Sequence, residues 1–310
     1  MSPPASPNTE SMDPLKAGGI LLSAYILWGL SPIYYKFAGF ASPLEIVLHR
    51  AVWSAPILAG LLIYSRRFNA AIALVTDWRT MALLTITALI IASNWLIFIW
   101  AINVGRVIEV SLGYYINPLM HIAVGVFIAS ERFGRWRALA VGLAALGVLN
   151  QIVQLGEIPW IGLYLAISFT VYGYIRKRIA VDGQTGLFWE TTLIFIPSVF
   201  LLGIFQFQGD ATFLDGPFEM AMLIGSGAAT VLPLLLWVVG ARHLSFSVIG
   251  VVQFVAPTLQ FSVGLAYGEV FTPAHAVTFA LIWLGLAVFV ADLFWHERQL
   301  KRQTVEQSSS

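Results

Sequence analysis

Long apolar stretches separated by short polar segments dominate the pattern of the chain. A bilayer core of about 30 Å requires roughly 20 apolar residues in a helix. Ten stretches qualify, so the pattern predicts ten transmembrane helices, at residues 17–38, 44–64, 80–101, 107–129, 136–155, 158–176, 187–206, 219–240, 246–267 and 273–295. Because the loops between them are mostly short, we expect an all-α integral membrane protein without a separate soluble domain.

Composition supports this class. Hydrophobic residues make up 58% of the chain and charged residues only 11%, whereas soluble domains carry about a quarter charged residues. The absence of cysteine excludes disulfides and cysteine-ligated metal sites. Residues 1–16 are rich in Pro and Ser and predict a disordered cytoplasmic tail rather than a signal peptide, because the first apolar run is long enough to span. Residues 297–310 form a second predicted tail.

The basic residues fix the expected orientation. Fourteen of the seventeen Lys and Arg residues fall on one side of the predicted membrane. The other side has Lys36 and Arg106, with Arg50 inside the second span, and its longest loop, FQGDATFLDGPFE, is acidic. Since short cytoplasmic loops accumulate Lys and Arg, we predict a multi-pass protein of the plasma (inner) membrane with both termini in the cytoplasm.

The two halves of the chain resemble each other weakly. Pro118 of the fourth span matches Pro257 of the ninth, and three residues later His121 matches Gln260. The second and seventh spans match as well: an ionisable residue precedes a proline by seven positions, as His49 does in one half and Glu190 in the other.

These matches predict two repeats of five spans, at residues 17–155 and 156–296. Because five is odd, the second copy must enter the membrane with the opposite orientation. Inverted repeats are typical of transporters, since they expose one central site alternately to the two sides.

Several longer strings resemble a known family. They are SNWLIFIWAIN, SLGYYINPL, SERF, VYGYIRKRIA, QTGLFWET and QFVAPTLQFSVGLAYGE, and together they are similar to RarD-type permeases of the EamA family, within the drug/metabolite transporter superfamily, over residues 17–296. The resemblance implies ten helices in two inverted halves and secondary active export or exchange of small metabolites, but no particular substrate. The family commonly has Gly-Glu-Arg where this chain has Ser130-Glu131-Arg132, a change that leaves a residue able to cap and that we do not expect to alter function.

Three ionisable residues, Glu45, His49 and Arg50, stand close together in the second span. Charges inside a membrane are costly and mark functional sites by default. We interpret His49 and Arg50 as substrate-binding residues that face an outward-opening cavity, where the imidazole titrates near neutral pH and the guanidinium attracts an anionic group. The alternative is that Arg50 snorkels outward while Glu45 only pairs with His49.

Glu190 is the counterpart of His49 near the cytoplasmic end of the seventh span. We interpret Glu45, His49 and Glu190 as coupling or gate residues on opposite sides of the pathway. The alternative for Glu190 is an interfacial carboxylate that pairs with the nearby basic cluster.

Deeper in the membrane, polar residues surround the two matched prolines. Pro118 and Pro257 cannot donate a helical hydrogen bond and are predicted helix breaks. Around them we expect a substrate lining, for which helix–helix hydrogen bonding alone is the alternative. The lining candidates are Tyr114, Asn117, His121, Gln253 and Gln260, with Asn94 and Tyr172 as further members.

These patterns predict a secondary active transporter of small metabolites or drug-like molecules, an exporter that works by alternating access, with proton coupling as the preferred mechanism. No nucleotide-binding loop of the G-x-x-x-x-G-K type is present. A membrane-embedded enzyme or a non-transport membrane protein is the alternative, but the carboxylates and histidines do not form a predicted catalytic or metal site. The expected partners are a small-molecule substrate, protons and the lipid bilayer, without nucleic acid or cofactor.

Overall fold

The chain is built from helices. The computed structural model describes residues 12–127, 134–156, 158–241, 243–244 and 246–308, and within these ranges it contains no β-strand. The elements are α1 (Pro14–Phe37), α2 (Pro43–Tyr64), α3 (Phe68–Ala73), the 3₁₀ helix η1 (Leu74–Thr76), α4 (Trp78–Asn103), α5 (Val107–Phe127), α6 (Arg135–Leu155), α7 (Trp160–Arg178), α8 (Gly183–Gln208), α9 (Pro217–Ala241), α10 (Phe246–Val252), α11 (Val255–Ala266) and α12 (Pro273–Ser308).

Local sequence sets where these helices begin and end. The side chains of Asp13, Ser42, Asp77 and Asp182 accept hydrogen bonds from backbone N–H groups in the first turns of α1, α2, α4 and α8. Such N-caps satisfy donors that have no partner within the helix. At its other end α8 stops at Gly209, whose φ of 81° is the left-handed conformation that favours glycine.

Six of the ten predicted spans are confirmed as helices long and apolar enough to cross a membrane: α1, α2, α4, α8, α9 and α12. Helices α5, α6 and α7 and the α10–α11 pair occupy the other four predicted ranges, and the count of ten spans stays a prediction. The pattern missed the short helix α3 after α2. The predicted tail at 297–310 is helical as far as Ser308, because its Glu, Gln, Lys and Arg residues favour helix. Residues 1–11 and the Ser130–Arg132 turn lie outside the described residues.

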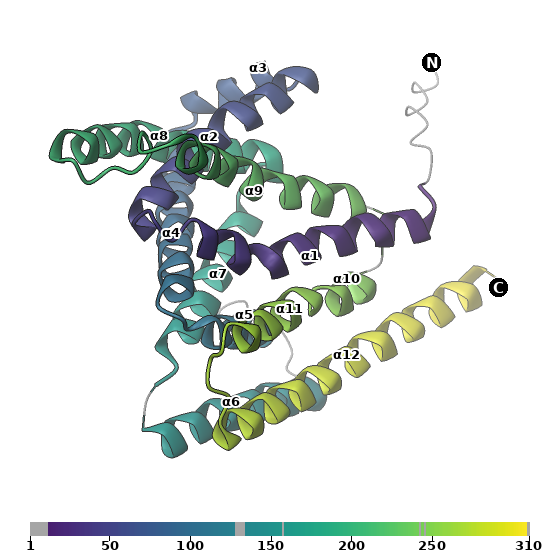
Figure 1. The fold of residues 1–310 in the computed structure, drawn as a ribbon. Coiled ribbons are helices and arrows are strands. Elements are labelled where there is room, and N and C mark those ends of the chain that lie inside the picture. Colours follow the sequence, from purple (N-terminus) through teal and green to yellow (C-terminus); the bar gives the residue numbers. More distant parts are fainter. Residues whose placement is uncertain (1–11, 128–133, 157, 242, 245, 309–310) are drawn as a thin grey trace, which may run out of the picture.

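The long helices pack in pairs that join distant parts of the chain. Helix α6 lies along α12, α1 along α9 and α4 along α7, and α2 contacts both α8 and α9. Helix α5 packs against α7 and α11, and α1 also contacts α11. Figure 1 shows the α6–α12 pair at one edge of the molecule, and α1 begins on the side where α12 ends.

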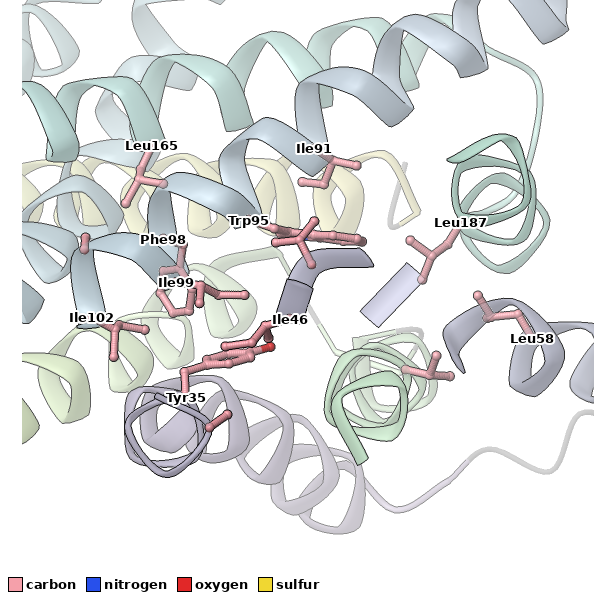
Figure 2. Close-up of a cluster of buried hydrophobic side chains, with 14 of the residues drawn as sticks. Tyr35, Ile46, Leu58, Ile91, Trp95, Phe98, Ile99, Ile102, Leu165 and Leu187 are labelled. Atoms are coloured by element: carbon pink, nitrogen blue, oxygen red, sulfur yellow. The ribbon is translucent and has the colours of Figure 1, made fainter. Parts of the chain in front are cut away.

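A buried apolar cluster lies where α1, α2, α4, α7 and α8 meet (Figure 2). Its members include Tyr35, Ile46, Leu58, Ile91, Trp95, Phe98, Ile99, Ile102, Leu165 and Leu187. The aromatic rings pack edge to face, with 5.9 Å between the ring centroids of Tyr35 and Phe98, a geometry that aromatic pairs prefer. Two of its rings, those of Tyr35 and Trp95, lie against Arg50 of α2.

Candidate substrate site and gate

Arg50 is turned into the protein rather than outward. Its side chain is 8% exposed, and the guanidinium carbon lies 4.0 Å from the ring centroid of Trp95 and 5.8 Å from that of Tyr35. Its Nε is buried without a hydrogen-bond partner. The alternative that Arg50 snorkels outward is therefore wrong, because α1 and α4 cover this face of α2 with aromatic rings.

His49 lies beside Arg50 on α2 and faces the loop between α8 and α9. Its ring stacks on Phe213, with 4.7 Å between centroids and 22° between planes. The indole Nε1 of Trp53 donates to His49 Nδ1 at 3.2 Å, which assigns the ring proton to Nε2 in the neutral imidazole. Nε2 is buried and without a hydrogen-bond partner. His49 therefore presents an unused donor.

Glu45 binds the same loop. It is fully buried, and its two carboxylate oxygens accept hydrogen bonds from Thr212, at 2.8 Å from the backbone N and at 3.0 Å from Oγ1. The alternative pairing of Glu45 with His49 is wrong. The physical reason is that the α8–α9 loop folds over the start of α2 and offers two donors. We call Glu45, His49, Arg50, Trp53, Tyr35, Trp95, Thr212 and Phe213 the Arg50 cluster.

Glu190 of α8 forms a second buried polar cluster. Its side chain is fully buried and accepts hydrogen bonds from Thr87 Oγ1 of α4 at 2.7 Å and from Tyr172 Oη of α7 at 3.1 Å. Arg176 Nε lies 3.4 Å from the same carboxylate. The alternative pairing of Glu190 with a basic residue is confirmed, and the carboxylate is buried inside the protein. We call these four residues the Glu190 cluster.

Arg176 connects the Glu190 cluster to the loops on that side. Its Nη2 donates to the backbone oxygen of Asp182 at 3.2 Å, and the Asp182 carboxylate pairs with Arg67 at 2.6 Å. Burial tends to raise the pKa of the Asp182 carboxyl, but hydrogen bonds from Thr185 and the nearby Arg67 outweigh it and hold that pKa below its usual range. Asp182 is therefore a carboxylate that ties the end of α7 to the loop after α2.

The two clusters lie at opposite ends of the α2–α8 pair. The Arg50 cluster joins the start of α2 to Thr212, which follows α8. At the other end, Trp189 near the start of α8 donates from Nε1 to the oxygen of Ala71, which follows α2, at 2.8 Å. The two helices therefore run antiparallel, with one charged cluster near each end.

The remaining predicted lining residues lie on α4, α5 and the α10–α11 segment. Asn94 donates from Nδ2 to Leu165 O at 3.2 Å and to Ser168 Oγ at 2.8 Å, which ties α4 to α7. Tyr114 packs edge to face against Phe98, with 5.9 Å between centroids. Asn117 is buried one turn further along α5. The side chain of His121 lies outside the part of the chain that the structure describes.

The prolines behave differently in the two halves. Helix α5 continues through Pro118. In the ninth predicted span, Gln253 and Phe254 form a turn between α10 and α11, and Pro257 stands in the first turn of α11. Proline clashes with the carbonyl four residues earlier, here that of Gln253, which explains the interruption. Gln260 is buried, and its Nε2 donates to Trp28 O of α1 at 3.3 Å, while its Oε1 is without a hydrogen-bond partner.

Two cavities lie away from both clusters. One of about 440 Å³ lies between α5, α11 and α12 and is lined mainly by apolar side chains such as Trp283. The other, of about 370 Å³, contains Glu109 and Glu269. Their carboxylates accept hydrogen bonds from backbone N–H groups at the starts of α7 and α5, respectively. These two carboxylates stabilise the starts of helices, and neither cavity contains a residue of the two charged clusters.

Comparisons with known proteins identify the family. The EamA-like transporter family model matches residues 16–150. An uncharacterized transporter of Vibrio cholerae is 43% identical, over 88% of this chain and 92% of its own length. Protein RarD of Salmonella typhimurium is 39% identical, over 90% and 96%. The chain belongs to the EamA-like transporter family, as a RarD-type permease. A solved crystal structure that is 18% identical superimposes with a TM-score of 0.57, over 88% of this chain and 96% of that one, and shows the same fold.

This RarD-type permease is thus a multi-pass membrane transporter, and several of its cluster residues were not among the predicted site residues. Trp53 stood out in no way from the other tryptophans, of which the chain has eleven. Thr212 and Phe213 belong to a loop noted only for its acidity. Arg176 was considered only as a member of the basic cluster near Glu190. The sequence did indicate this pair, because Arg176 and Glu190 carry opposite charges at the same predicted membrane face.

Proposed function

We propose that this permease is a secondary active exporter of small metabolites or drug-like molecules that works by alternating access. The observation that carries the proposal is the placement of the Arg50 and Glu190 clusters at opposite ends of the antiparallel α2–α8 pair. Each cluster joins the two halves of the chain, as a gate between two moving halves must: the Arg50 cluster connects α2 to the α8–α9 loop, and the Glu190 cluster connects α4 to α7 and α8. In this proposal the lining between the gates includes Tyr114, Asn117 and Gln260.

The packing partners support two inverted five-helix repeats in which α1, α2, α4, α5 and α6 correspond to α7, α8, α9, α10–α11 and α12. If each helix is replaced by its counterpart in the other half, the α1–α9 contact becomes α7–α4, and the α2–α9 contact becomes α8–α4. In the same way the α5–α7 contact becomes α11–α1. All six of these contacts are present. Three further extensive pairs, α2–α8, α5–α11 and α6–α12, each join corresponding helices. A structure with approximate two-fold symmetry has this property, and such repeats can exchange conformations to open opposite sides.

Charge distribution supports the orientation. The basic side chains Arg67, Arg79, Arg176 and Arg178 lie at the end of the molecule that carries the Glu190 cluster. By the excess of Lys and Arg in cytoplasmic loops, the Glu190 cluster is the cytoplasmic gate and the Arg50 cluster the outer one. Both termini are then cytoplasmic, in an inner membrane.

The proposal is tested by measuring the movement of a bound compound across a membrane that contains the protein. The purified permease is screened against metabolites and antibiotics for thermal stabilisation, since a ligand of the folded state raises apparent stability with its concentration. Stabilising compounds are then loaded, radiolabelled, into proteoliposomes. The proposal predicts exchange across the membrane that requires the protein. Stabilising ligands that never cross the bilayer, or that are chemically converted, would contradict transport and favour a membrane-embedded enzyme.

Proton coupling is proposed for Glu190, because this buried carboxylate changes partners and charge if it is protonated. With a substrate from the screen, Glu190→Gln is expected to abolish the stimulation of flux by a pH gradient. Exchange at equal pH should persist, because it needs no change of protonation. Asp215→Asn, at an exposed loop carboxylate, is the control and should keep the response. A Glu190→Gln protein that responds to the gradient as the wild type does would remove Glu190 from the coupling mechanism.

A further inference from the structure

Arg50 carries a buried positive charge that no carboxylate in the described part of the chain neutralises. Among the described residues, no carboxylate lies within ion-pair distance of its guanidinium, and the contacts it makes are with the rings of Trp95 and Tyr35. A cation–π contact offsets only part of the cost of removing a charge from water. Helix α2 therefore holds a cation in an environment that favours the arrival of an anion.

The nearest carboxylate in the sequence does not serve as the counter-ion. Glu45 uses both oxygens for Thr212. The Glu190 carboxylate is engaged with Arg176 at the other end of α2 and α8. Each acid of the two clusters is thus already engaged, and neither of them neutralises Arg50.

The unused hydrogen-bonding groups of the Arg50 cluster are donors. Arg50 Nε–H is buried without a partner, and so is His49 Nε2, which carries the ring proton because Nδ1 accepts from Trp53. Unpaired buried donors favour a ligand rich in acceptors. A cationic or purely apolar ligand would leave both donors unsatisfied.

We propose that Arg50 anchors the carboxylate of a small organic monoanion whose planar apolar part packs between the surrounding rings. This inference rests on the proposed transport function and names its substrate class. The single cation matches one negative charge better than the two of a phosphate monoester, and the planar guanidinium fork matches a carboxylate. Trp95 and Tyr35, whose rings already contact the guanidinium, are the aromatic side chains that such a ligand would meet beside the cation.

The test compares ligands that share one ring and differ in charge. Benzoate, benzyl alcohol, benzylamine and inorganic phosphate are titrated against the purified full-length permease, and apparent dissociation constants are taken from the shift in unfolding temperature. Benzoate alone is expected to stabilise at millimolar concentration. Arg50→Met should weaken benzoate binding about 10- to 100-fold, the range for loss of a hydrogen-bonded charge. Arg50→Lys should weaken it less, since it keeps the charge and loses the fork.

Lys36→Met is the matched control, because Lys36 also lies over an aromatic ring, that of Tyr267 at 5.0 Å, but outside the Arg50 cluster. It should leave benzoate binding unchanged. If Arg50→Met does not fold, Arg50→Lys alone still tests whether the planar guanidinium group is needed.

The inference is overturned if benzyl alcohol or benzylamine binds as well as benzoate, if no carboxylate binds, or if both Arg50 variants bind benzoate as the wild type does. Protein-dependent exchange of a neutral or cationic compound would then preserve the transport function, whereas bound compounds that never cross the bilayer would remove it.

Discussion

Three ionisable residues of α2 have different roles within six positions of the chain. Glu45 fixes a loop through Thr212, His49 stacks on Phe213, and Arg50 enters an aromatic cluster. One helical step of about 100° separates neighbouring side chains, so residues adjacent in sequence meet different helices. The cost of these groups in a membrane is offset by different neutral partners in each case: hydrogen bonds at Glu45 and His49, and aromatic rings at Arg50.

At Glu45, substitution is expected to release the α8–α9 loop. Glu45→Ala leaves the backbone N–H and the hydroxyl of Thr212 without acceptors, so it should lower the free energy of unfolding by about 1–3 kcal/mol, measured as thermal unfolding in detergent. Asp210→Ala removes an exposed carboxylate of the same loop and should have almost no effect. Equal losses of stability in both variants would show that the hydrogen bonds between Glu45 and Thr212 have no specific role.

The polarity of single residues was predictable from sequence, but their partners were not. Because intramembrane charge is rare, Glu45, His49, Arg50 and Glu190 stood out as functional candidates. Their partners come from positions far away in the chain, such as Thr212 for Glu45, 167 residues apart. No local pattern encodes such a contact.

At the scale of helices, close approach depends on small residues at a few crossings. A Cβ added to Gly113 of α5 would lie 2.6 Å from the backbone oxygen of Gly162 in α7. Small residues at interfaces let membrane helices approach and gain van der Waals contact. The α5–α7 contact therefore depends on the absence of a side chain at both positions.

Gly113→Ala is expected to push α5 and α7 apart and to lower the free energy of unfolding by about 1–3 kcal/mol, the usual cost of overpacking. Gly142→Ala on α6 is the control, because an added Cβ would meet nothing within 4 Å. Its effect should be neutral or slightly stabilising, since Ala favours helix over Gly. Urea or thermal unfolding in the same detergent compares the two, and a Gly113→Ala protein as stable as Gly142→Ala would contradict the packing argument.

Helix positions were predictable because a bilayer demands long apolar runs, and α2, predicted at 44–64, is observed at Pro43–Tyr64. The break between α10 and α11 was expected at Pro257 but lies at Gln253 and Phe254, because a proline disturbs the turn before itself. Helix α3 was missed because its apolar run is too short to span. It is held by Trp189, from the other half of the chain.

At the scale of the whole molecule, the two repeats that we propose predict a pattern of contacts between helices. The most extensive helix pairings keep their pattern when the halves are exchanged, although the two halves resemble each other only weakly in sequence. Sequence alone suggested this symmetry from prolines and charges at similar offsets. The contacts that carry it arise from packing, which many different apolar side chains can satisfy.

The most direct test of this account asks whether the two clusters open alternately. The chain contains no cysteine, so the Phe213→Cys and Thr87→Cys variants each carry one thiol, at the Arg50 and Glu190 clusters, respectively. Each is labelled with a maleimide in proteoliposomes, with and without Glu190→Gln, which weakens the Glu190 cluster. Alternating access predicts faster labelling at position 87 and slower labelling at position 213 when Glu190 is replaced. Labelling rates that rise together, or a change at position 87 with none at position 213, would contradict it.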